Sequence, residues 1–116
     1  TVTEKTTFKH AFRNHRCIVP VSGWYEWQTI GSKKHKYLFS HVDGQPLFMG
    51  GFWYPGEHNQ LVTLTTNPNE KCGEYHHRMP VLILPQYIDY WLNSSPEELG
   101  PLLAPVESEL VEIHAA

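Results

Sequence analysis

The sequence has 116 residues, of which 41% are apolar and 13% aromatic, enough for one globular domain or a piece of one. Nine basic and twelve acidic side chains give a formal charge of −3, so a nucleic-acid site would have to be a local basic patch. No apolar run approaches the roughly 20 residues that span a membrane, and two cysteines are too few for a disulfide framework, which favours a reducing, intracellular compartment.

Helix signals occur in three parts of the chain. Apolar residues spaced three and four apart predict a helix across residues 1–15 that gives way to a loop. A turn at residues 67–70 predicts a short helix that ends at residue 73 or 75. Pro85 opens a helix to about Asn93, and Ser95 caps a second short helix that follows it.

Strand signals fill most of the rest. Apolar runs between turn residues predict strands at 17–21, 24–30, 37–42, 46–54, 60–66, 81–84 and 110–114. Asp43-Gly44 predicts a hairpin that joins 37–42 to 46–54. Gly50-Gly51 predicts a bulge or a close backbone approach. The sequence therefore predicts one α+β domain over residues 1–116, mostly antiparallel, with a curled, barrel-like sheet.

Residues 16–27 carry the first chemical signal, a single carboxylate between aromatic rings. In an extended segment Trp24 and Glu26 share one face, while Tyr25 and Trp27 share the other. Neighbouring rings desolvate a carboxylate and disfavour its charged form, which suits an acid/base catalyst. The simpler alternative is an exposed glutamate on a half-buried strand.

His76 and Arg78 form the second signal, just before the apolar run at 81–84. If this segment is extended, the two side chains lie on one face, whereas His77 points the other way. An imidazole transfers protons near neutral pH, and a guanidinium presents a fork that fits a phosphate. An ordinary surface or core histidine and a surface arginine remain the alternatives.

Eight histidines raise the question of a metal site. Cys72 and His76 are four residues apart and would share a helical face, where Cys17 could join them in space. Paired C-x2-C or H-x3-H modules are missing from the sequence, so no metal or cofactor is assigned. A metal-dependent hydrolase stays as an alternative.

The two signals also carry a family resemblance. R-C-I-V-P-V-S-G-W-Y-E-W at residues 16–27, followed by H-H-R-M-P-V-L-I-L-P at 76–85, resembles the SRAP family. These are SOS response-associated peptidase-like proteins, which include the abasic-site shield protein. The resemblance covers about residues 1–105.

The resemblance implies chemistry on single-stranded DNA that carries abasic sites. In this family an N-terminal cysteine closes a stable thiazolidine crosslink with the lesion aldehyde, after removal of the initiator methionine. Glu26 matches the family's acid/base glutamate, and His76 matches the histidine that moves a proton at the deoxyribose oxygen and acts in crosslink reversal. Arg78 would hold a phosphate, and Trp27 would stack beside the lesion.

The resemblance also implies that part of the domain is missing. Family members begin with Met-Cys and carry an N-A-R-x-E motif, and Thr1-Val2 matches the positions just after that motif. Neither Cys17 nor Cys72 matches the nucleophile. We therefore expect the C-terminal portion of a SRAP domain, inactive by itself, from a monomeric protein without membrane partners, cytoplasmic and nucleoid-associated in a bacterium or nuclear in a eukaryote. The alternatives are a non-catalytic single-strand-binding module and, more remotely, Thr1 as an N-terminal nucleophile.

Overall fold

The computed structural model describes residues 2–116, with side chains from Thr6 onward, so Thr1 lies outside the described residues. The elements are α1 (Val2–Asn14), β1 (Arg16–Val21), β2 (Trp24–Ile30), β3 (Lys33–His41), β4 (Leu47–Tyr54), β5 (Gln60–Thr63), β6 (Thr65–Thr66), α2 (Glu70–Gly73), β7 (Met79–Pro80), α3 (Ile88–Asn93) and β8 (Val111–Ala115). Short 3-10 turns lie at Pro85–Tyr87, Pro96–Glu98, Gly100–Leu103 and Ser108–Leu110. Within residues 2–116 no helix is long and apolar enough to cross a membrane.

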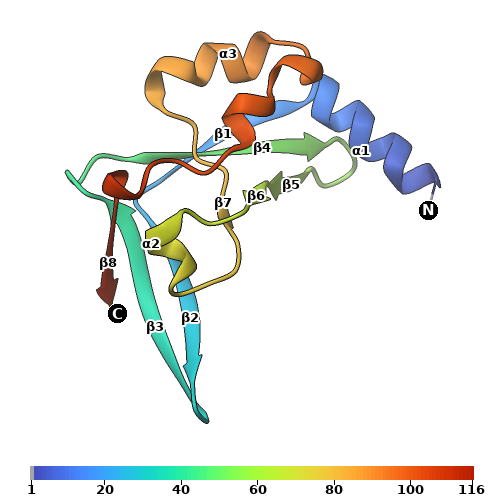
Figure 1. Cartoon of the computed structure of the whole chain (residues 1–116). Coiled ribbons are helices and arrows are strands. Elements are labelled where there is room, and N and C mark those ends of the chain that lie inside the picture. Colours follow the sequence, from blue (N-terminus) through green and yellow to red (C-terminus); the bar gives the residue numbers. More distant parts are fainter. Residues whose placement is uncertain (1) are drawn as a thin grey trace.

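The strands form three antiparallel sheets, in the orders β1-β4-β5, β2-β3-β8 and β6-β7 (Figure 1). This confirms the α+β, mostly antiparallel class. The barrel-like expectation is corrected, because β1 and β2 both stay at the edges of their sheets and no closed barrel forms among the described residues. A closed sheet has no such edges.

The predicted hairpin between 37–42 and 46–54 is wrong, because β3 and β4 belong to different sheets. The turn itself exists, since Gly44 adopts a φ of 72° and its N–H donates to the His41 carbonyl at 3.0 Å. The strand before it is longer than predicted and begins at Lys33 instead of residue 37. A second positive-φ glycine, Gly31, therefore closes the hairpin of β2 with β3, and the Asp43-Gly44 turn leads into the other sheet.

Two other predicted strands differ from the structure. The run at 60–66 divides into β5 and β6 at Leu64, which packs against a cluster of buried apolar side chains. Residues 81–83 are buried, and this segment lies along β4 through a single antiparallel bridge between Leu82 and Met49 instead of a regular strand. The Val81 carbonyl accepts from the Gly50 N–H at 2.9 Å, and the Ile83 N–H donates to the Phe48 carbonyl at 2.7 Å. The Val81 N–H donates to the Leu64 carbonyl at 2.9 Å, so the segment also contacts the residue between β5 and β6.

The helix signals are confirmed with small changes. Asn69 caps α2 by accepting from the Cys72 N–H at 2.8 Å. The helix predicted from Pro85 begins as a 3-10 turn before α3. Ser95 forms a capping box with Glu98, although the turn that it opens is 3-10.

The core consists of two clusters, and β4 passes close to both. The first contains Trp24, Phe39, Leu47, Cys72, Met79, Leu82 and Val111, and the second contains Val81, Ile83, Trp91 and Leu99. A Cβ added at Gly50 would lie 3.0 Å from the Trp91 ring, and one added at Gly51 would lie 2.7 Å from the Val62 carbonyl oxygen. The predicted close backbone approach is therefore confirmed.

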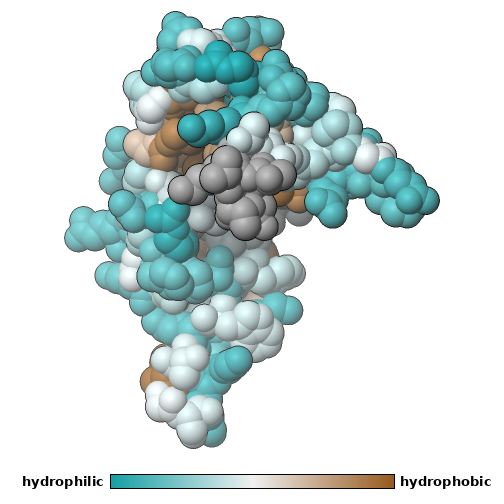
Figure 2. All heavy atoms as spheres, turned by 90° about the vertical axis from the view of Figure 1, so that its right-hand side faces the viewer, coloured by the Kyte–Doolittle hydropathy of each residue, from teal (hydrophilic) through white to brown (hydrophobic). Residues whose placement is uncertain are grey.

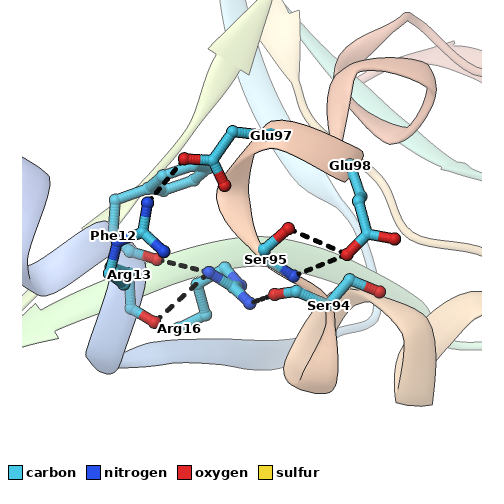
Figure 3. A network of polar contacts seen from close by, with 7 residues as sticks. All are labelled: Phe12, Arg13, Arg16, Ser94, Ser95, Glu97 and Glu98. Atoms are coloured by element: carbon cyan, nitrogen blue, oxygen red, sulfur yellow. Dashed lines mark hydrogen bonds and ion pairs between the residues drawn. The ribbon is translucent and has the colours of Figure 1, made fainter.

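Arg16 ties α1, β1 and the end of α3 together (Figure 3). Its guanidinium donates to the carbonyls of Phe12 at 2.6 Å and Trp91 at 2.7 Å, and also to the carbonyl of Ser94. Burial and the neighbouring charge of Arg13 lower the pKa of Arg16. This contact anchors the start of β1, from which the chain runs directly into β2 and the first chemical signal.

Candidate functional site

Alternation along β2 separates the two halves of the first signal. Trp24 is buried, Tyr25 is exposed, Glu26 is half-buried and Trp27 is exposed. The predicted sharing of faces is thus confirmed. Antiparallel pairing sets Glu26 opposite Tyr37 of β3, so both side chains point to the face on which the loop after α2 lies.

The loop that follows α2 brings His76 onto this face. Cys72 is buried, and its carbonyl accepts from the N–H groups of Tyr75 at 3.0 Å and His76 at 3.1 Å. The Tyr75 ring packs edge-on against Tyr37, with ring centroids 4.7 Å apart. Gln28 Nε2 donates to the Glu74 carbonyl at 2.7 Å. A ring contact and a hydrogen bond therefore hold the loop to the β2–β3 sheet.

Glu26 and His76 meet as a carboxylate–imidazole pair. His76 Nε2 lies 3.4 Å from Glu26 Oε2, and the side chains are 31% and 24% exposed respectively. Both groups are thus partly shielded and yet open to a ligand. Such a pair can pass a proton between substrate and protein.

The backbone of Arg78 sets the orientation of the imidazole. Its N–H lies 3.2 Å from His76 Nδ1, and its carbonyl lies 3.0 Å from the same nitrogen. The Arg78 backbone therefore offers a donor to one tautomer of the ring and an acceptor to the other. In this orientation Nε2 faces Glu26.

His77 stacks on His76 instead of pointing to the other face. The ring centroids are 4.6 Å apart, with 29° between the planes. The expectation of opposite faces fails because the chain bends at His77 and is not a strand there. The exposed His77 ring thus covers one side of the His76 imidazole.

Arg78 is fixed by neutral acceptors. Its guanidinium donates to Thr65 Oγ1 at 3.3 Å, to the Thr65 carbonyl at 2.9 Å and to Asn67 Oδ1 at 3.1 Å. Within residues 6–116 no acidic side chain forms an ion pair with it. The positive charge of Arg78 is therefore held in place by neutral partners and is not neutralised by an acidic side chain within these residues, which suits an anionic ligand.

Trp27 is not on the face of Glu26. Its side chain is 54% exposed on the opposite face of β2, where Lys36 Nζ lies 5.6 Å from its ring centroid. The structure thus brings Glu26 and His76 together, with the Arg78 backbone against His76, and leaves Trp27 on the opposite face of the strand. Its stacking beside a lesion stays a prediction.

Comparison with known proteins identifies the family. Residues 1–116 match the family model described as SOS response associated peptidase (SRAP). The chain belongs to the SRAP family. The ordered pair of motifs at 16–27 and 76–85 was therefore a sufficient signal.

Relatives of this SRAP chain include named proteins and a crystal structure. Abasic site processing protein YoaM of Bacillus subtilis is 32% identical over 124 aligned residues, which cover 98% of this chain and 55% of the relative. Abasic site processing protein YMR114C of Saccharomyces cerevisiae is 36% identical over 100 residues, covering 78% and 27%. A crystal structure of a Bacteroides thetaiotaomicron protein matches with a TM-score of 0.87 and 29% identity, covering 99% and 55%. The chain spans about half the length of the Bacillus relative.

The two cysteines of the SRAP chain lie in surroundings that disfavour thiolates. Burial raises the pKa of Cys72 to about 11, against smaller opposing effects of Asn69 and Lys71, and burial also raises the pKa of Cys17. A nucleophilic thiol needs the opposite shift. Among the residues that the structure describes, no three His, Cys, Asp or Glu side chains lie close enough together to hold one metal ion.

An apolar hollow of about 240 Å³ lies elsewhere, lined mainly by residues 45–48 and 82–85. A second, of about 220 Å³, adjoins residues 101–107. Neither lining includes Glu26, His76, Arg78 or Trp27. Glu26, His76, Arg78 and Trp27 therefore lie outside both apolar hollows.

The SRAP motifs alone did not indicate four contacts at the site. Gln28 follows Glu26 by two positions, so strand alternation could have placed it on the same face. Thr65 and Asn67 become partners of Arg78 only through the pairing of β6 with β7. Lys36 was assigned to no strand, and only the β2–β3 register sets it opposite Trp27.

Proposed function

We propose that the complete protein processes abasic sites in single-stranded DNA and forms a covalent crosslink with them. The observation that carries the proposal is the pair of Glu26 and His76, 3.4 Å apart, with the imidazole held by the Arg78 backbone. The names of the relatives, abasic site processing proteins, support the same substrate.

The chemistry needs two kinds of proton transfer. The ring-closed abasic sugar must open to its aldehyde: the C1′–O4′ bond breaks, His76 would give the ring oxygen a proton from Nε2, and Glu26 would take the proton of the C1′ hydroxyl. An amine then condenses with the aldehyde and water leaves, for which Glu26 would accept and return protons. Attack of a thiolate on the imine carbon forms the C–S bond, and the imine nitrogen takes up a proton to complete a thiazolidine.

The thiol would come from outside the printed sequence. Cys72 is buried and Cys17 lies within β1, and burial raises the pKa of both, so neither suits the attack. We propose instead an N-terminal cysteine of the complete protein, exposed by removal of methionine. Glu26 and His76 would also assist that removal.

DNA contacts follow from charge and exposed rings. Arg78 would hold a phosphate beside the lesion, since its charge is not neutralised by an acidic partner within residues 6–116. Trp27 offers an exposed ring on which a base can stack. We expect a monomer that acts where the DNA is, in the bacterial cytoplasm or the eukaryotic nucleus.

The test uses the complete protein and an unpaired oligonucleotide with one abasic site. After incubation, a denaturing gel should resolve a slower band, and this band should be missing when the lesion is a tetrahydrofuran analogue, which has no aldehyde. If plain strands bind but no band forms, the protein is a non-catalytic single-strand binder. If neither binding nor a band is seen, the proposal is wrong.

A further inference from the structure

The β2–β3 hairpin projects from the body of the molecule, below α2 in Figure 1. Directly opposite residues of an antiparallel pair point to one face. The register sets Trp27 opposite Lys36, and Lys34 lies two positions from Lys36 on the same face, as does Tyr25 from Trp27. We call Tyr25, Trp27, Lys34 and Lys36 the aromatic–lysine strip. Its rings are 55% and 54% exposed.

Lys36 connects the two rings of the strip. Its Nζ lies 4.3 Å from the centroid of Tyr25 and 5.6 Å from that of Trp27. Both distances are within cation–π range, so the ammonium keeps the rings in register while their outer faces stay open. A base that stacks there would displace the ammonium toward its own phosphate.

The strip lies in the most concentrated basic segment of an acidic chain. Lys33, Lys34 and Lys36 fall within one short stretch, although the whole chain has a formal charge of −3. In Figure 2 the lower end of the molecule, where the hairpin lies, is white and teal apart from one brown group. Rings and lysines without an apolar patch fit a polyanion with flat bases better than a hydrophobic protein surface.

The position of β2 links the strip to the proposed catalytic pair. β2 is the edge strand of its sheet, with β3 on one side and no paired strand on the other among residues 2–116. Glu26 and His76 lie on one face of this edge, and the strip lies on the other face. A flexible strand that passes the pair can therefore cross the edge and reach the strip within a short distance.

We propose that the unpaired DNA strand flanking the lesion crosses the edge of β2 that pairs with no strand among residues 2–116 and binds the aromatic–lysine strip. Its bases stack on Tyr25 and Trp27, and its phosphates pair with Lys34 and Lys36. This inference rests on the proposed function for the identity of the strand, but it assigns a separate surface and a path for the flank.

The test measures how affinity depends on flank length. The complete protein is titrated with fluorescent oligonucleotides that carry one tetrahydrofuran lesion and thymidine flanks of increasing length on the 5′ or the 3′ side. For wild type, lengthening the flank on one side of the lesion should raise the affinity up to a plateau, and lengthening the other flank should not. Tyr25→Ala should reduce this gain in affinity about tenfold. Lys36→Gln should also lower the salt dependence of log affinity by about 0.7.

Matched variants separate the strip from general effects. Tyr25→Phe should keep the gain, because the ring remains. Lys9→Gln on α1 and Tyr87→Ala, both changes at exposed residues away from the hairpin, should also keep it. If the two strip variants change the sedimentation of the free protein and leave the gain intact, the strip is a protein contact and the inference is wrong.

Wild type distinguishes this inference from the proposed function. If wild type crosslinks natural abasic DNA but its affinity does not rise with either flank, only the binding role of the strip is wrong. If wild type neither binds nor crosslinks abasic DNA, the proposed function and the role of the strip are both wrong.

Discussion

His76 Nε2 lies 3.4 Å from Glu26 Oε2, although one residue belongs to β2 and the other to the loop after α2. The contact depends on two separate supports. The Arg78 backbone orients the imidazole from one side, and the Gln28 side chain ties the loop to β2 from the other. Each support and each member of the pair can be changed separately.

Removing either proton-transfer group should slow crosslinking without unfolding the protein. Glu26→Gln and His76→Gln should each lower the crosslinking rate by about 10²- to 10⁴-fold. Stability in urea should change by less than about 1 kcal/mol, because both side chains are partly exposed. The surface pair of Glu112 and His114, 3.3 Å apart, provides the control: the same changes there should leave the rate near wild type.

Gln28→Glu tests the support of the loop. The new side chain has the same size but cannot donate to the Glu74 carbonyl, so the loop should lose its hydrogen bond and His76 should drift from Glu26. We expect about 1 kcal/mol lower stability in urea and about a tenfold slower crosslinking rate. Gln86→Glu, the same change at an exposed position, should affect neither. Equal rates for both variants would show that Gln28 has no positioning role.

Arg16→Lys should destabilise the fold more than Arg13→Lys. A lysine cannot donate at once to the carbonyls of Phe12, Trp91 and Ser94, so partly buried acceptors lose charged partners. The expected loss is about 2–4 kcal/mol in urea unfolding. The Arg13 side chain forms an exposed ion pair with Glu97, so its replacement should cost much less. A smaller loss at Arg16 than at Arg13 would contradict this assignment.

Cys72 should make the fold sensitive to alkaline pH. Burial raises its pKa from near 9 to about 11 in the folded protein, so the contribution is fully present below pH 9 and is lost as pH rises toward 11. The loss should reach about 3 kcal/mol. Cys72→Ala removes this titration, so the stability difference between wild type and Cys72→Ala should shrink by that amount between pH 8 and pH 11. A constant difference would mean that the thiol ionises normally.

Burial of Cys72 also predicts that its thiol reacts slowly with alkylating reagents. Iodoacetamide should alkylate Cys72 only after unfolding, because the thiolate is the reactive form and the side chain is buried. Mass spectrometry of native and denatured samples measures this directly. Rapid labelling of native protein at Cys72 would contradict the structure.

Local sequence patterns predicted most elements but not which strands pair. Alternation around Glu26, the turn that opens α2 and the cap at Ser95 depend on neighbouring residues, and all three are confirmed. The Asp43-Gly44 turn indicated a hairpin, yet β3 pairs with β2 along one edge, through the Gly31 turn, and with the distant β8 along the other. Pairing is a choice between distant segments, which a local pattern cannot make.

The same distinction between local pattern and tertiary packing applies to the candidate site. The motifs picked out Glu26 and His76, whose side chains the structure brings together, and Arg78, whose backbone contacts the His76 ring. The supports could not be predicted, since the contacts of Gln28 with Glu74 and of Arg78 with Thr65 depend on tertiary packing. Trp27 was adjacent to Glu26 in the sequence, and adjacency in a strand means opposite faces.

The central claim, that Glu26 and His76 act as one unit on abasic DNA, is tested most directly by a double-mutant cycle. Crosslinking rates are measured for wild type, Glu26→Gln, His76→Gln and the double variant of the complete protein. Residues that act together give non-additive losses. We predict that the double variant is no slower than the slower single variant. If the two losses multiply, or if neither variant slows the reaction, the pair does not work as a unit and the account is wrong.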